Sequence, residues 1–187
     1  TPEALEVLCT KKNLRLLKVD MSKEEGGHNQ YVSMNGGILV QEQDIETKTV
    51  AADMCVTEAK PCDAQLTDLD FAWRIVKHVK SNAIVVVKDG ATLGVGAGQM
   101  NRVGSAKIAL EQAQAALAEA GKDIKAEALV LGSDGFFPFD DTVTLAAEYG
   151  VKAIVQPGGS VRDEDSVKKA NECGITMLCT GMRHFKH

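Results

Sequence analysis

Apolar positions along the chain follow two periods, and these periods alternate through its second half. Short runs of consecutive apolar residues predict buried strands at residues 83–87, 128–131, 153–156 and 176–178. Apolar residues on one helical face predict helices at residues 66–80, 106–120, 142–149 and 164–173. A glycine directly follows each of the last three helices and supplies the usual helix stop. Strands that alternate with helices indicate a layered α/β fold whose later part is a parallel sheet.

The first half of the chain adds a short helix and two hairpins to this pattern. Thr1-Pro2 predicts the start of a helix that ends near Cys9, and residues 14–19 predict a strand. Turn residues join extended segments at 31–34 and 38–41, and again at 83–87 and 92–95. Residues 42–63 show no period and predict a long connection, after which Thr67 and Asp70 have the spacing of a capping box. We therefore expect one domain over residues 1–187 with a mixed sheet.

Composition and charge narrow the classes of function. A hydrophobic content of 44% is enough for a substantial core, and no apolar run approaches the roughly 20 residues of a membrane-spanning helix. The acidic first residues do not resemble a secretory signal. A net charge of -5 argues against a nucleic-acid binder. That charge favours small ligands instead. The five cysteines form no C-x-x-C pair, which favours reduced thiols in a cytoplasmic protein.

Two polar or glycine-rich segments stand where predicted strands begin or end. Asn82 precedes a buried strand and could be either a structural cap or a ligand contact. The stretch GVGAGQMNR (residues 94–102) lets backbone amides approach a ligand, and a helix follows it. Its spacing matches neither the dinucleotide-binding nor the Walker motif. A tightly packed strand corner is the alternative for these glycines.

Two later segments carry aromatic and basic residues. Three of the five phenylalanines lie in GSDGFFPFDD (residues 132–141), directly after a predicted strand. Exposed aromatic clusters indicate a binding surface, and a flat heteroaromatic ligand could stack on a phenylalanine while a carboxylate contacts its ring nitrogens. In the final segment, TGMRHFKH (residues 180–187), Arg183 could bind a phosphate or carboxylate. A solvated basic terminus is the alternative.

These segments carry a resemblance to a known family. AWRIVKHVKSNAI (residues 72–84), GVGAGQ (94–99) with Arg102, SDGFFPF (133–139), PGGS (157–160) and MRHF (182–185) follow the family order. The chain resembles the C-terminal half of the transformylase domain of bifunctional purine synthesis enzymes. These enzymes join an IMP cyclohydrolase to an aminoimidazole carboxamide ribotide (AICAR) formyltransferase.

The resemblance implies a reaction, a fold and a set of site residues. The reaction moves a formyl group from the co-substrate 10-formyltetrahydrofolate to AICAR, giving FAICAR in IMP biosynthesis. The fold is a three-layer α/β/α sandwich with a mixed sheet, the second of two cytidine-deaminase-like units. Asn82 would be catalytic and, with Arg102, would face the folate and the reacting centre. Substrate contacts would come from Phe136 and Arg183 with AICAR, and from Pro138, Phe139 and Asp141 with folate.

The chain also departs from the family pattern. The family's catalytic Lys-His pair, which precedes a Val-x-Pro-Ala-Gly sequence, is absent, because Lys77-His78 lacks the Pro-Ala-Gly continuation. A placed general base typically contributes about 10²–10⁴-fold to a rate. The chain is therefore expected to be inactive alone and to need the N-terminal half of the same enzyme within a homodimer.

Two further readings follow from the same residues. The cyclohydrolase module is absent, and a non-catalytic module that binds folate or AICAR is the alternative function. A deaminase-like hydrolase is disfavoured because the zinc-ligand signature of such enzymes is missing, so no metal is predicted.

Overall fold

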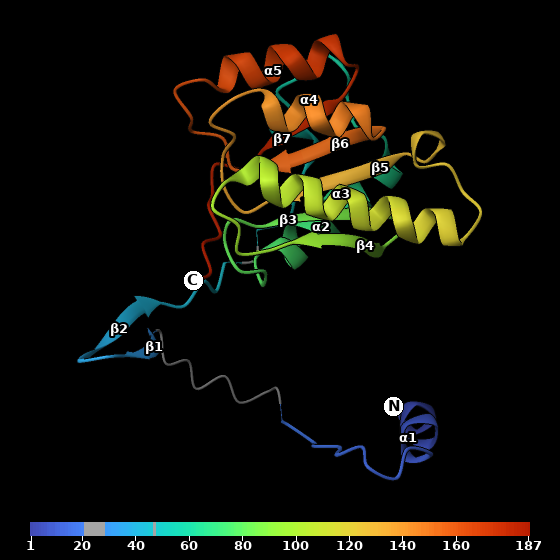
Figure 1. Ribbon diagram of the computed structural model, residues 1–187, viewed down its shortest axis with the longest axis vertical. Coiled ribbons are helices and arrows are strands. Elements are labelled where there is room, and N and C mark those ends of the chain that lie inside the picture. Colours follow the sequence, from blue (N-terminus) through green and yellow to red (C-terminus); the bar gives the residue numbers. More distant parts are fainter. Residues whose placement is uncertain (21–28, 47) are drawn as a thin grey trace. The chain divides into compact units, whose positions relative to one another are not determined.

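The computed structural model describes residues 1–20, 29–46 and 48–187. These residues divide into two units, Thr1–Gln43 and Asp44–His187. Figure 1 labels the helices and strands of both. No helix among the described residues has both the length and the apolar character needed to cross a membrane.

The described residues of the first unit form one helix and one hairpin. The helix α1 (Pro2–Cys9) starts as predicted, because the side chain of Thr1 accepts a hydrogen bond from the backbone N–H of Ala4 at 3.3 Å. The strands β1 (Asn29–Met34) and β2 (Gly37–Glu42) pair antiparallel across the predicted turn. The strand predicted at residues 14–19 is wrong: these residues have no regular structure, and no described strand pairs with them. A strand requires hydrogen-bonding neighbours, which an apolar run alone does not supply.

The second unit is a five-stranded mixed sheet covered on both faces by helices. The strands lie in the order β4-β3-β5-β6-β7, with β3 antiparallel to both neighbours and β5, β6 and β7 parallel. Their bounds are β3 (Ile84–Lys88), β4 (Ala91–Gly96), β5 (Leu129–Ser133), β6 (Val151–Gln156) and β7 (Thr176–Cys179). The helices are α2 (Asp63–Val76), α3 (Arg102–Glu119), α4 (Asp141–Glu148) and α5 (Asp163–Glu172), with short 3-10 turns η1 (Ala52–Met54) and η2 (Ile124–Ala126).

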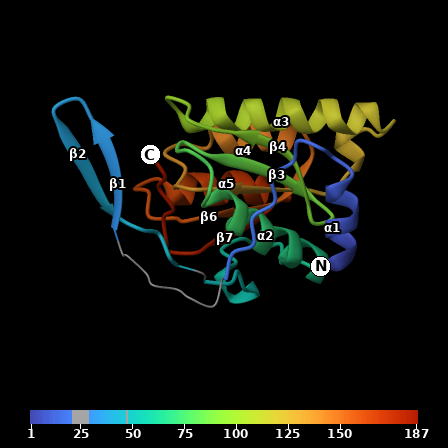
Figure 2. The ribbon, with the colours of Figure 1, turned by 90° about the horizontal axis from the view of Figure 1, so that it is seen from below.

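Each face of the sheet has its own hydrophobic core. Residues of α2, including the buried Trp73, pack with Val85 and Val87 of β3. Ile84 and Val86 of the same strand point to the other face, where they join side chains of α3, α4 and α5. Figure 2 shows α3 and α2 on opposite sides of the sheet. The alternation of β3 side chains between two cores confirms the predicted three-layer α/β/α sandwich with a mixed sheet.

Two helices begin earlier than their apolar pattern indicates. α2 starts at Asp63, where Gln65 Oε1 accepts from the N–H of Cys62 at 3.0 Å, so the capping box predicted at Thr67 and Asp70 is wrong. α3 starts at Arg102, because Asn101 Oδ1 accepts from the N–H of Gly104 at 2.7 Å. The side chain of an N-cap residue satisfies a backbone donor that has no partner inside the helix. Because α3 starts this early, Arg102 is its first residue.

Candidate functional site

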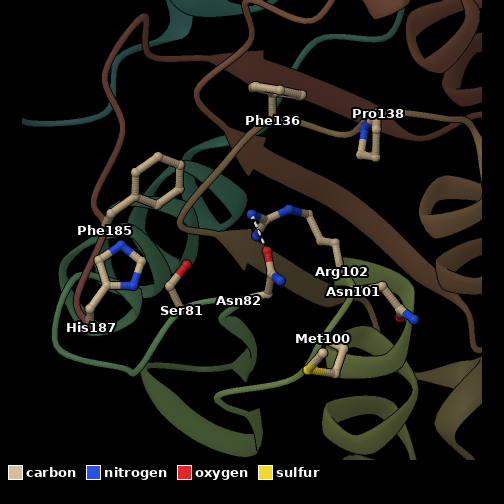
Figure 3. Close-up of a pocket in the computed structure, with 9 residues that line it drawn as sticks. All are labelled: Ser81, Asn82, Met100, Asn101, Arg102, Phe136, Pro138, Phe185 and His187. Atoms are coloured by element: carbon tan, nitrogen blue, oxygen red, sulfur yellow. Dashed lines mark hydrogen bonds between the residues drawn. The ribbon is translucent and has the colours of Figure 1, made fainter.

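A pocket of about 540 Å³ opens at one edge of the sheet in the second unit. Because β3 and β5 are antiparallel, the start of β3 lies beside the end of β5, with Ile84 opposite Ser133. Four segments meet there: the residues before β3, the start of α3, the loop after β5 and the C-terminal tail (Figure 3). The lining residues are Ser81, Asn82, Met100, Asn101, Arg102, Phe136, Pro138, Phe185 and His187.

Arg102 is the centre of the pocket floor, by which we mean the lining residues Asn82 and Arg102 and the buried Ser133 and Asp134 bonded to Arg102. Its Nη1 donates to Ser133 Oγ at 2.9 Å and is paired with the carboxylate of Asp134. Its Nη2 donates to Asn82 Oδ1 at 2.9 Å. Arg102 is only 7% exposed, and Asp134 is fully buried. The guanidinium group is therefore held in one orientation, with its charge balanced by a buried partner.

Asn82 connects the pocket floor to the glycine-rich corner. Its side-chain Nδ2 donates to the carbonyl oxygen of Gln99 at 2.9 Å, and its side-chain Oδ1 accepts from Arg102. The backbone carbonyl oxygen of Asn82 accepts from Ser105 Oγ at 2.7 Å. Both ends of the side-chain amide are therefore engaged, one by the corner and the other by Arg102. Asn82 therefore has a structural role, one of its two predicted alternatives, and also lines the pocket floor.

Asp134 is a central residue of the floor that the sequence-based site assignment did not include. Its Oδ1 accepts from the backbone N–H of Ala83 at 3.1 Å as well as from Arg102. Its Oδ2 has no hydrogen-bond partner among the described residues. A carboxylate directly after a buried strand is a visible sequence signal. That signal does not reveal which distant cation balances the charge, because Arg102 comes from another segment.

By the rim we mean Phe136, which lines the pocket, and Arg183, which contacts the Phe136 ring without lining the pocket. The rim is more open than the floor. The guanidinium carbon of Arg183 lies 4.7 Å from the centroid of the Phe136 ring, which is cation–π geometry. Arg183 is exposed, whereas Phe136 is half-buried. The next residue, Phe137, is fully buried in the core between the sheet and α3. Adjacent phenylalanines thus have different roles, one at the rim and one in the core.

Phe139 and Asp141 lie outside this pocket. Phe139 is 50% exposed and contacts Arg162, whose guanidinium carbon lies 5.1 Å from the ring centroid beside a second pocket of about 200 Å³. Asp141 is exposed at the start of α4, where its Oδ1 accepts from the N–H of Thr142 at 2.7 Å. The folate contacts assigned to both residues remain predictions. Pro138, also assigned to folate, does line the first pocket.

The loop after β6, which leaves the sheet at the same edge as the loop after β5, supports the rim. Asp163 accepts from the backbone N–H of Gly159 at 2.6 Å and from that of Ser160 at 3.2 Å, which fixes the PGGS segment. The N–H of Gly181 donates to the carbonyl oxygen of Pro157 at 2.8 Å and ties the tail to this loop. Burial, followed by the nearby Asp163 and Cys55, raises the pKa of the Cys179 thiol to about 11. Cys179 is therefore a neutral thiol at physiological pH.

Several lining residues were not predicted as site residues. Ser81, Met100 and Asn101 flank the predicted Asn82 and Arg102, so their proximity in sequence was an available signal. Phe185 and His187 reach the pocket because the tail folds back: the N–H of Ser81 donates to the carbonyl oxygen of Lys186 at 2.8 Å. A terminal segment carries no periodic pattern that would predict this docking.

Comparison with known proteins connects this geometry to a family. The sequence model of a family described as AICARFT/IMPCHase bienzyme matches residues 1–112. The chain belongs to this family. The matched residues of the AICARFT/IMPCHase family model include Asn82 and Arg102. They end before the phenylalanine-containing residues 132–141 and before the C-terminal tail.

Individual relatives extend the similarity over the whole chain. The bifunctional purine biosynthesis protein PurH of Anoxybacillus flavithermus is 57% identical over 187 residues, which are 100% of this chain and 35% of that protein. PurH of Bacillus subtilis is 55% identical over 185 residues, covering 99% of this chain and 34% of that protein. The chain thus spans about a third of the length of the AICARFT/IMPCHase relatives that it matches.

Two solved structures resemble the chain more distantly. One is a diaminohydroxyphosphoribosylaminopyrimidine deaminase/5-amino-6-(5-phosphoribosylamino)uracil reductase from Thermotoga maritima, with TM-score 0.35, 22% identity and coverage of 60% of this chain and 34% of that chain. The other is a mutant of NE0047 in complex with 8-azaguanine, with TM-score 0.43, 17% identity and coverage of 74% and 90%.

Proposed function

We propose that this chain supplies part of an AICAR formyltransferase, in which a formyl group moves from 10-formyltetrahydrofolate to the 5-amino group of AICAR. The chain would be the second cytidine-deaminase-like unit of that domain, acting in IMP biosynthesis in the cytoplasm. One observation carries the proposal: segments far apart in the sequence, each bearing the family resemblance, line a single pocket.

The floor suits the polar part of the reaction. Attack of the amine on the formyl carbon places negative charge on the formyl oxygen, and preorganised donors stabilise such an oxyanion strongly. Arg102 is already fixed by Ser133, Asp134 and Asn82, so little reorganisation is needed as that charge develops. In this proposal Asn82 and Arg102 face the folate and the reacting centre.

The rim suits a flat, anionic nucleotide. Phe136 offers an aromatic face, and Arg183 lies over it without a charged partner among the interactions described for it. An exposed cation–π contact is worth only about 0.5–1 kcal/mol. Arg183 can therefore exchange the ring for an anionic group of AICAR, a charge-assisted contact of greater strength, while the AICAR base stacks on Phe136. Pro138, Phe139 and Asp141 are assigned to folate.

The pocket lacks a paired acid and base. Of its lining residues only Arg102 and His187 are ionisable, and arginine does not give up its proton in proteins. We assign the removal of the amine proton to the N-terminal half of the same enzyme, within a homodimer. Neither a metal ion nor a nucleic acid or membrane partner is part of the proposal.

The lack of a paired acid and base in the pocket favours a second candidate function, a module that binds folate or AICAR without catalysis. It would keep Phe136, Pro138 and Arg183 at the pocket while contributing nothing to the proton transfer. The two functions predict the same ligands and different rates.

The proposal is tested by measuring AICAR and folate binding to the chain by calorimetry, and formylation with and without the remaining part of a PurH relative. We expect binding by the chain alone, no formylation above background, and activity after mixing. Arg74→Ala changes an exposed arginine outside the pocket and is the control for the arginine variants, so it should bind both ligands as the wild type does. Intact binding with no activity after mixing would favour the binding module. Absence of binding to both ligands would overturn the proposal.

A further inference from the structure

The C-terminal tail is anchored by a side chain that points away from the pocket. His184 is 1% exposed, whereas Arg183 before it and Phe185 after it are exposed at the site. Adjacent residues share one backbone, so an inward His184 fixes the chain from which Arg183 and Phe185 project. The way in which His184 is held therefore bears on both of these residues.

His184 is held between α2 and the segment that enters the second unit. Its ring lies 4.3 Å from that of Trp73, measured between centroids, and the two ring planes are tilted by 49°. Its Nδ1 lies 2.5 Å from Asp44 Oδ2, and the other carboxylate oxygen of Asp44 lies 3.5 Å from Lys77 Nζ. Trp73 belongs to α2, and Lys77 is its C-cap residue. Asp44 thus joins the tail to the end of a helix that packs on the sheet.

The backbone of His184 is tied to the floor of the pocket. Its N–H donates to the carbonyl oxygen of Asp134 at 3.0 Å, and the carboxylate of Asp134 is the buried partner of Arg102. The side chain of His184 is therefore held by Trp73 and Asp44, and its backbone is held by Asp134 of the pocket floor. Neither His184 nor Asp44 lines the pocket.

We propose that His184 and Asp44, packed on Trp73, form a positioning pair that keeps Arg183 against Phe136 and keeps Phe185 at the pocket. The pair acts through these two residues and contacts no reacting group. The identity of the ligand rests on the proposed function above, whereas the docking of the tail does not.

The test uses the complete 187-residue chain and two substitutions of Asp44. Trypsin cleaves after Arg183, so mass spectrometry of the loss of residues 184–187 reports release of the tail. We expect Asp44→Ala to be cleaved there about tenfold faster, the factor that corresponds to loss of one hydrogen bond to a charged group. Asp44→Asn keeps an oxygen acceptor for the imidazole and should show an intermediate rate. AICAR affinity should fall in the same order.

The matched control is Asp70→Asn. Asp70 also ties the entering segment to α2, since its carboxylate accepts from the N–H of Val50 at 3.0 Å and from Arg74. It makes no contact with the tail, so its variant should keep wild-type cleavage after Arg183. Equal cleavage of Asp44→Ala and the wild type, or equal acceleration by Asp70→Asn, would overturn the proposal.

Two further outcomes keep the positioning pair separate from the proposed function. A wild-type chain that binds no AICAR would contradict the function, and the cleavage rates would still decide whether the pair docks the tail. If circular dichroism shows that Asp44→Ala does not fold, the rate of the milder Asp44→Asn decides. Cleavage of Asp44→Asn after Arg183 at the wild-type rate would then overturn the proposal of a positioning pair.

Discussion

Arg102 in the pocket floor and Arg183 beside the pocket lie in opposite surroundings. Arg102 in the floor is 7% exposed and bonded to Ser133, Asp134 and Asn82, whereas Arg183 in the rim is exposed and lies over one aromatic ring. The family resemblance assigns both arginines to ligand contacts. The structure adds that the first also supports the fold, because a buried carboxylate depends on it. Substitutions in the floor should therefore affect folding, and substitutions in the rim should affect binding.

The largest effect is expected from Arg102→Met. The substitution leaves the fully buried Asp134 without its cation, and breaking a buried ion pair costs about 3–5 kcal/mol. The free energy of unfolding from urea denaturation measures this loss. The double variant Arg102→Met/Asp134→Leu should recover much of the stability, because it leaves no unpaired charge. If the free energy of unfolding of Arg102→Met lay within about 1 kcal/mol of the wild-type value, Arg102 would not support the fold and the contrast with Arg183 would disappear.

The next effect is expected from Gly96→Ala, which tests how the floor is supported. A Cβ atom at Gly96 would lie 1.9 Å from the carbonyl oxygen of Ser105, so α3 would have to move away from β4. Overpacking of this kind costs typically about 1–3 kcal/mol. Because Arg102 is the first residue of α3, the variant should also weaken ligand binding.

Gly37→Ala is the control for this prediction. A Cβ atom at Gly37 would meet no atom within 4 Å, so its urea midpoint should stay close to that of the wild type. Equal midpoints for the Gly96 and Gly37 variants would show that the close approach of α3 and β4 does not support the floor.

The same glycines show what sequence reasoning can and cannot supply. Close packing was one of two predicted roles for this stretch, and Gly94 and Gly96 fill it, since a Cβ at either would lie 1.9 Å from a backbone oxygen of α3. The strands and helices of the second unit were predicted because they bury periodic apolar faces. The start of α3 was misplaced by four residues, because the Asn101 cap is polar and precedes the apolar pattern.

The site was predictable where the resemblance named residues and less so where partners are distant. Asn82, Arg102, Phe136 and Pro138 line one pocket, whereas Phe139, Asp141 and Arg183 do not line it. The pairing of Arg102 with Asp134 spans 32 residues, and that of His184 with Asp44 spans 140. Pairings between side chains so far apart follow from the topology of the sheet and leave no local pattern. The strand predicted at residues 14–19 is wrong for a related reason, since a strand depends on a hydrogen-bonding partner elsewhere in the sequence.

In the rim, Arg183→Ala should separate binding from folding. The loss of a charge-assisted contact should weaken AICAR at least about tenfold and change folate affinity far less. Because Arg183 is exposed, the free energy of unfolding should change by no more than about 0.5 kcal/mol. Calorimetry with each ligand and urea denaturation measure the two effects. Equal losses of AICAR and folate affinity would contradict the assignment of Arg183 to AICAR.

A smaller effect is expected from Phe136→Ala. Removing an aromatic partner should weaken AICAR by about two- to tenfold, in line with stacking energies of about 0.5–1.5 kcal/mol. Its neighbour offers a matched contrast, since Phe137 is fully buried and Phe137→Ala should destabilise the fold by about 3–5 kcal/mol. Comparable destabilisation by both variants would place the Phe136 ring in the core.

The smallest effect is expected at Cys179, beneath the loop that supports the rim. Burial raises the pKa of its thiol from 9.0 to about 11, so between these pH values the unfolded chain loses this proton and the folded chain retains it. The unfolded state is thereby favoured, and stability should fall as pH rises through this window. Cys179→Ser removes the ionisation, so its urea midpoint should decline less steeply from pH 8 to 11 than that of the wild type. The control is Cys62→Ser at the exposed N-cap of α2, whose urea midpoint should decline with pH as steeply as that of the wild type. Parallel profiles for all three proteins would mean that Cys179 is as accessible to water as the rim above it.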